Sequence, residues 1–62
     1  MTQKELLYME DAICHEESII QILKEAIPKC SGEMGNFFEN EIIKHQEMKE
    51  LLMDKLKEKA NG

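Results

Sequence analysis

Hydrophobic residues follow the spacing of an amphipathic helix along the first part of this 62-residue chain. The apolar positions recur at helical intervals up to a proline: Leu6, Met9, Ile13, Ile20, Leu23 and Ile27. Between Ile13 and Ile20 the series holds Glu16, where an apolar residue is expected. The stretch from Thr2 to Glu5 has the form of a capping box. In this motif the side chains of Thr2 and Glu5 each accept a hydrogen bond from the backbone amide of the other residue. The pattern therefore predicts a helix over about residues 3–27.

A short break separates this segment from a second amphipathic one. Pro28 lacks an amide and disfavours helical geometry in the residue before it, so a turn is predicted over about residues 28–31. Ser31 can cap a second helix, predicted over about residues 32–59, with 61–62 as a frayed tail. Its predicted stripe mixes apolar and polar residues: Met34, Phe38, Glu41, Ile42, His45, Met48, Leu52 and Leu56.

Two amphipathic helices joined by a short turn predict a single all-α domain over residues 1–62, folded as an antiparallel hairpin. A chain of this length buries only about 60% of the surface that its unfolded form exposes. A lone hairpin also covers only one side of each helix. We therefore expect a homodimer that forms a four-helix bundle, since two-fold dimers are the commonest closed assemblies.

Composition and charge narrow the classes of function. A net charge of −5 with no basic cluster argues against nucleic acid as a partner. The sequence has no apparent signal peptide or transmembrane run, so synthesis in the cytoplasm and no membrane partner are expected. Cys14 and Cys30 are about 24 Å apart along a helix, too far for a disulfide within the chain. No phosphate loop or nucleophile–base set is present, which argues against a hydrolase or transferase.

Three polar residues of the two stripes form a candidate metal site. Glu41 and His45 are one turn apart and share a helix face. The turn is centred between residues 29 and 30. Glu16 lies about thirteen positions before this centre, and the midpoint of Glu41 and His45 lies about thirteen positions after it, so all three are at the same depth in the hairpin. A two-fold dimer would collect four carboxylates and two imidazoles, the donor set of di-iron and di-manganese bundles. Iron, manganese or zinc would suit it.

The candidate site also has a reading without a metal. The spacing from Glu41 to His45 is one residue longer than the Glu-x-x-His motif of di-metal bundles. Glu16 could instead reach solvent at the edge of its stripe, while His45 hydrogen-bonds to Glu41. His15 adjoins Glu16 and is a further candidate ligand, although its position away from the stripe favours exposure. Both readings stay open at this point.

Two segments carry a resemblance to a known family. Residues 4–16, KELLYMEDAICHE, resemble the opening helix of small spore coat F-like proteins, which have an Asp-Ala-x-x-His-Glu stretch. The segment from Phe38 to Lys44 and His45 is similar to their second helix. The resemblance implies a ferritin-like fold, a role in sporulation, a place in the spore coat and other coat proteins as partners. It makes Glu16 and His45, with His15 beside them, the residues of interest.

Three hypotheses of function follow. The first is a spore-associated, ferritin-like hairpin that dimerises around a carboxylate–histidine di-metal site. The second is a structural or interaction protein of the coat with the same bundle and no metal. The third is a di-iron oxidase or peroxidase. No catalytic residue is assigned, and the sequence favours a protein that is not an enzyme.

Overall fold

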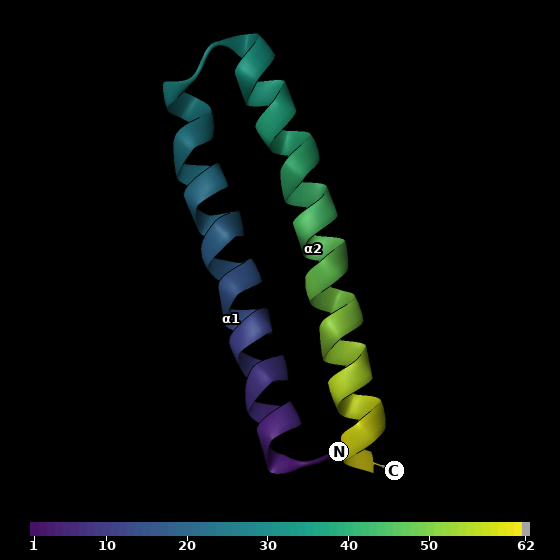
Figure 1. Cartoon of the computed structure of the whole chain (residues 1–62). Coiled ribbons are helices and arrows are strands. Elements are labelled where there is room, and N and C mark those ends of the chain that lie inside the picture. Colours follow the sequence, from purple (N-terminus) through teal and green to yellow (C-terminus); the bar gives the residue numbers. More distant parts are fainter. Residues whose placement is uncertain (62) are drawn as a thin grey trace.

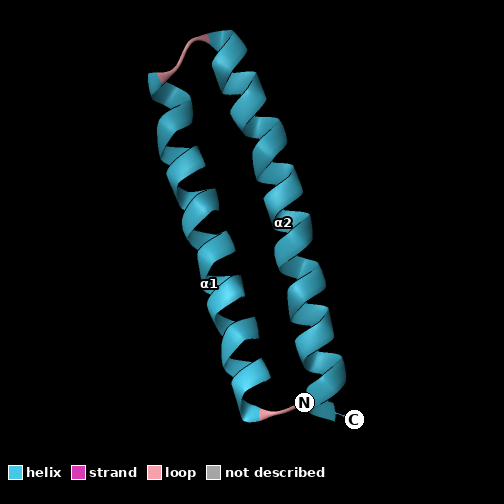
Figure 2. Cartoon of the chain, in the orientation of Figure 1, coloured by secondary structure: helices cyan, strands magenta, loops and turns pink. Residues whose placement is uncertain are grey.

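The protein is an all-helical hairpin in a computed structural model that describes residues 1–61. Helix α1 spans Gln3–Ala26, a 3-10 turn η1 spans Ile27–Lys29, and helix α2 spans Gly32–Asn61. The two long helices run antiparallel and side by side (Figure 1), and only a short loop joins them at one end (Figure 2). Both predicted helices are therefore present. Asn61 of the expected frayed tail is helical, and Gly62 lies outside the described residues.

A capping box starts α1, as the sequence predicts. The Glu5 amide donates to the Thr2 hydroxyl at 3.1 Å, and the Thr2 amide donates to a carboxylate oxygen of Glu5 at 2.9 Å. The hydrogen bond from the Thr2 amide, followed by the one with the Thr2 side chain, lowers the pKa of Glu5 below its ordinary value. Amides that the helix itself cannot pair thus find a partner at this end.

The connection between the helices is a single tight turn with Pro28 near its start. The Cys30 amide donates to the carbonyl of Ile27 at 3.2 Å, which closes the turn. Ser31 then starts α2: its carbonyl accepts from the Gly35 amide at 2.7 Å, and its hydroxyl lies 3.5 Å from the Met34 amide nitrogen. Ser31 is therefore the cap that the sequence predicts.

The helices meet along a seam of residues spaced alternately by three and four, which are half-buried or buried in the hairpin. In α1 and the first residue of η1 the seam is Leu6, Met9, Ile13, Glu16, Ile20, Leu23 and Ile27, and in α2 it is Gly35, Phe38, Ile42, His45, Lys49, Leu52 and Leu56. Three members of the predicted stripe of α2 are not in the seam: Met34, Glu41 and Met48. Met34 and Met48 are each 47% exposed, and the seam passes through Gly35 and Lys49 instead. Steps of three and four from Phe38 reach Gly35 and Lys49, and not Met34 and Met48. A shift of one residue would turn the side chain by about 100° away from the seam.

One hairpin buries very little. Among the described residues only Ile20 and Ile42 have large side chains that are buried, with 8% and 9% of their surface exposed. The Cα atoms extend over 45 × 15 × 10 Å, and their radius of gyration is 14.4 Å, against about 11 Å for a compact domain of this length. The molecule is a thin rod in which almost every side chain reaches solvent.

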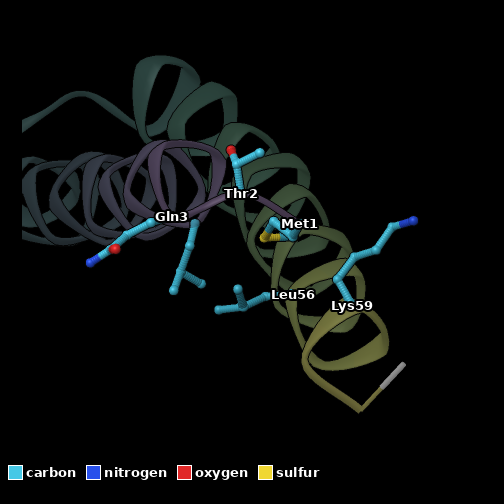
Figure 3. A pocket seen from close by; sticks show the side chains of 6 residues that line it. Met1, Thr2, Gln3, Leu56 and Lys59 are labelled. Carbon is cyan, nitrogen blue, oxygen red and sulfur yellow. The ribbon is translucent and has the colours of Figure 1, made fainter.

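The open end of the hairpin brings the start of α1 next to the end of α2. Met1, Thr2, Gln3 and Leu6 line a cavity of about 390 Å³ there with Leu56 and Lys59. Figure 3 shows these side chains around the cavity. In the part of the chain that the structure describes, neither helix has a stretch apolar enough to cross a membrane.

Candidate functional site

A contact between Glu16 and His45 lies near the middle of the seam. The Nδ1 atom of His45 in α2 is 2.5 Å from Oε2 of Glu16 in α1. The two side chains are 31% and 15% exposed, so the pair is half-buried. A carboxylate can only accept, so the imidazole donates through Nδ1–H, whether it is neutral or charged. The predicted meeting of Glu16 with the polar residues of the second stripe is therefore present for His45.

Glu41 is the residue of the predicted triad that does not join this contact. Its Oε2 atom lies 3.9 Å from Nζ of Lys44, three residues further along α2. The alternative in which His45 hydrogen-bonds to Glu41 is wrong for the hairpin, because the imidazole contacts Glu16 across the seam. Glu41 is nevertheless half-buried, with 29% of its side chain exposed, and stands one turn before His45 on the same helix.

A single hairpin does not complete a metal-ligand set. The described residues contain no group of three His, Cys, Asp or Glu side chains that could hold an ion. His15 and Cys14 are exposed, although they lie within two residues of Glu16, and Cys30 lies in the turn. Glu16 and His45 supply two donors, and the other ligands would have to come from Glu41 after a rearrangement or from a second copy.

A second polar contact crosses the seam one turn away. Nζ of Lys49 lies 3.4 Å from a carboxylate oxygen of Glu17, with 32% and 53% of the side chains exposed. Glu17 and Lys49 line a cavity with Gln46. This cavity is on the side of the hairpin that does not carry Tyr8. The predicted stripe of α2 includes Met48 and not Lys49, so this pair is absent from the sequence-based expectations. The alternation of three and four counted back from Leu56 would have found it.

The contact belongs to a wider polar layer. Residues seven apart lie on nearly the same side of a helix, about 10 Å apart along its axis. Five rows at this spacing have an apolar residue at each end and a polar one in the middle. Two are in α1, Met9–Glu16–Leu23 and Tyr8–His15–Ile22, and three are in α2, Phe38–His45–Leu52, Phe37–Lys44–Leu51 and Met34–Glu41–Met48. We call the five central residues, His15, Glu16, Glu41, Lys44 and His45, the polar layer. All lie within about one turn of the Glu16–His45 contact.

Comparison with known proteins gives no match. No protein-family model, no curated protein and no solved structure matches the chain.

One side of the hairpin carries most of the large apolar residues that are exposed. Tyr8 and Lys55 line a common cavity with Met9, which places Tyr8 of α1 and Lys55 of α2 on the same side. Steps of seven from Tyr8 and Lys55 lead to Ile22 on α1 and to Met48 and Met34 on α2. One step of four from each, followed by steps of seven, adds Ala12, Ile19 and Ala26 on α1, and Leu51 and Phe37 on α2. We call it the apolar face: the large residues Tyr8, Ile22, Met34, Phe37, Met48 and Leu51, which are exposed, and the half-buried Ala12, Ile19 and Ala26.

The opposite side carries more charge, although it also holds an apolar cavity that is lined by Ile13, Cys14, Met53 and Leu56 with Glu10 and Lys57. It carries the Glu17–Lys49 ion pair, and a cavity on it is lined by Gln21, Lys24 and Gln46. Its exposed apolar residues, such as Leu7 and Ile43, are separated by charged and amide side chains. Of the polar layer, His15 and Lys44 are exposed, and they lie midway along the apolar face.

Proposed function

We propose that the chain is an assembly module: two copies pair through their apolar faces to form a four-helix bundle closed around the polar layer. The observation that carries this proposal is the exposure of the apolar face. Tyr8, Ile22 and Leu51 are each more than 60% exposed in the hairpin. Large contiguous apolar patches on a soluble surface mark sites of interaction.

The exposed area supports a partner of the hairpin's own size. The chain has 4940 Å² of accessible surface, against about 4,100 Å² for a compact protein of 7.2 kDa. The excess of about 800 Å² equals what one partner buries in an interface of standard size. A second copy fits this requirement, because its apolar face has the same length and the same central polar layer. Two-fold pairing would also supply the core that one hairpin lacks.

The test is the oligomeric state of the full chain and of two matched lysine variants. Phe37 and Ile43 both lie on α2 and are each 54% exposed, but Phe37 belongs to the apolar face and Ile43 to the opposite side. We expect sedimentation equilibrium at micromolar concentration to give a dimer for the unchanged chain and for Ile43→Lys. Phe37→Lys should shift the equilibrium toward monomer. A folded monomer for the unchanged chain overturns the proposal.

A second candidate function is binding of a divalent metal in the same layer, and the Glu16–His45 contact favours it. With its Nδ1 proton directed to Glu16, a neutral imidazole keeps a lone pair on Nε2. Metal-binding histidines are held in this way by a carboxylate on the other ring nitrogen. Glu16, predicted as a ligand, would then orient the imidazole, while His45 and Glu41 from both copies would bind iron, manganese or zinc.

Metal content and chelator-dependent melting test this second candidate. A metal-binding dimer should carry metal after purification and lose thermal stability when a chelator is added. His45→Ala and Glu41→Ala should abolish both effects, whereas Glu47→Ala, an exposed carboxylate on the same helix, should not. Melting that is indifferent to chelator in metal-loaded protein argues for the purely structural module. A place in the spore coat rests on the resemblance alone and stays a prediction.

A further inference from the structure

Two methionines of the apolar face lie on either side of the polar layer. Met34 and Met48 are each seven residues from Glu41, about 10 Å along α2 in either direction. Each is 47% exposed in the hairpin. Pairing of two apolar faces would cover these thioethers in both copies, in whichever direction the second copy runs. The methionines therefore occupy the part of the proposed interface that is next to its polar centre.

Met53 is an internal reference for these two side chains. It lies on the same helix and is also 47% exposed. It lines a cavity with Ile13 and Cys14 on the side of the hairpin opposite the apolar face. A reagent dissolved in water therefore has similar access to all three thioethers in the free hairpin, whereas pairing through the apolar face covers only Met34 and Met48.

Oxidation turns a methionine from an apolar side chain into a polar one. The thioether sulfur attacks one oxygen of a hydroperoxide, so that an S–O bond forms and the O–O bond breaks. The sulfur loses two electrons, and the proton of the transferred hydroxyl passes to the leaving oxygen. Hydrogen peroxide thus leaves as water, and an alkyl hydroperoxide leaves as an alcohol. The product is a sulfoxide, whose oxygen accepts hydrogen bonds.

The sulfoxide oxygen is better satisfied in the free hairpin than in the pair. Water can hydrogen-bond to it at Met34 and Met48 as long as these side chains are exposed. In the interface the oxygen would meet apolar side chains of the partner, and burying an acceptor without a donor is costly. The ammonium of Lys44, one turn before Met48, already lies 3.9 Å from a carboxylate oxygen of Glu41. Oxidation of either methionine therefore favours separate hairpins.

We propose that Met34 and Met48 form a redox switch on the apolar face: a hydroperoxide converts them to sulfoxides in the free hairpin and so prevents pairing. This inference rests on the proposed homodimer. Pairing and oxidation compete for the same two side chains. The dimer protects them, and each sulfoxide weakens the dimer. Met53 reacts with the same oxidant without affecting pairing.

Site-resolved oxidation tests this competition. The full chain with Cys14→Ser and Cys30→Ser, which removes both free thiols, is treated with hydrogen peroxide at protein concentrations below and above the dissociation constant of the dimer. Mass spectrometry of its peptides gives the oxidation rate at each methionine. At Met34 and Met48 the rate should fall in proportion to the fraction of free chains, while the rate at Met53 stays constant. Equal behaviour of all three methionines overturns the proposal.

Sedimentation of the fully oxidised chain tests the consequence for assembly. Its dissociation constant should be at least about tenfold higher than before oxidation, because each sulfoxide loses its hydrogen bonds on pairing. Met53→Leu should respond to peroxide in the same way. Met34→Leu combined with Met48→Leu keeps the volume of the face and should remain a dimer after the same treatment. Met1, Met9 and Met53 are still present in that double variant.

The outcomes separate the switch from the homodimer on which it rests. An unchanged dissociation constant in protein that carries sulfoxides at Met34 and Met48 overturns the switch and leaves the homodimer standing. Peroxide-induced dissociation of the double leucine variant also overturns the switch, because the sensitive side chain would then lie elsewhere. A folded monomer before any oxidation overturns both. The oxidation rates are measured with all the methionines in place, so they test the switch even if the double variant does not pair.

Discussion

The imidazole of His45 donates a hydrogen bond to the carboxylate of Glu16, 2.5 Å away across the seam and 29 residues distant in the chain. On its turn side this contact is followed by Ile20 and Ile42, the two large side chains most deeply buried among the described residues. The hairpin therefore places a polar pair next to the little core that it has. Several expected outcomes depend on this relationship.

Removing either member of the pair should destabilise the hairpin. We expect Glu16→Ala and His45→Ala each to lower the free energy of unfolding by about 1–3 kcal/mol, because each leaves a half-buried polar partner unsatisfied. The double variant should lose less than the two single losses added together, since the residues share one interaction. Chemical denaturation of all four proteins at one concentration measures this coupling.

The Glu17–Lys49 pair is the matched control, because it also crosses the seam but is more exposed on the carboxylate side. Its coupling should not exceed about 0.5–1 kcal/mol. Equal coupling in both pairs, or none between Glu16 and His45, would show that the central contact has no special weight.

Replacing the pair by apolar residues should separate stability from specificity. In Glu16→Leu with His45→Leu, we expect a free energy of unfolding equal to or higher than that of the unchanged chain, because buried polar pairs are often no better than apolar ones. The polar layer would no longer align the copies, so sedimentation should detect more than one assembly state. A double variant that stays a single, uniform dimer contradicts a role for the pair in alignment.

The capping box should make the stability of α1 depend on pH in the acidic range. The pKa of Glu5 is lowered in the folded chain, chiefly by the Thr2 amide. The ionised carboxylate of Glu5 therefore stabilises the folded chain at pH values above its unfolded pKa. This stabilisation is lost as the pH falls through the folded pKa. Glu5→Gln should remove this part of the pH dependence, and NMR titration of Glu5 measures the lowered pKa directly. An ordinary pKa would mean that the box does not form in solution.

Thr2→Ala tests the other half of the capping box. The variant removes the hydroxyl that accepts from the Glu5 amide and keeps the Thr2 amide that donates to the carboxylate. We expect a loss of about 1 kcal/mol in the free energy of unfolding. Thr2→Ser, which retains the hydroxyl, should stay close to the unchanged chain in the same denaturation experiment.

Gly35→Ala should stabilise the protein. A Cβ atom at Gly35 would lie 3.8 Å from the carbonyl oxygen of Ile27 and 4.0 Å from its Cγ2, which is ordinary contact. Alanine in a helix interior is favoured over glycine by about 0.5–1 kcal/mol. Thermal melting should therefore shift upward, and Gly32→Ala at the first position of α2 should change it less. A lower melting temperature for Gly35→Ala would mean that the seam is tighter at the turn than these distances indicate.

Local chemistry in the sequence was sufficient to predict the helices and their connection. The capping box at Thr2, the proline at the turn and the cap at Ser31 each act within a few residues, so their effects can be read without knowing the fold. The depth of Glu16 relative to the second stripe also followed from counting along two rigid rods of known rise. That counting correctly brought Glu16 to His45.

Only the tertiary structure decided which neighbours face each other across the seam. Met48 and Lys49 differ by about 100° around α2, and the sequence carried one signal for each: hydrophobicity favoured Met48, and the alternation of three and four favoured Lys49. Packing against α1 selected Lys49, because the strict alternation through Phe38, His45 and Leu52 brings its long stem to the seam. The same rotation determines that His45 contacts Glu16, while Glu41 is left near Lys44 beside the apolar face. Spacing places residues on a face, and only contact between two helices determines the partner of each.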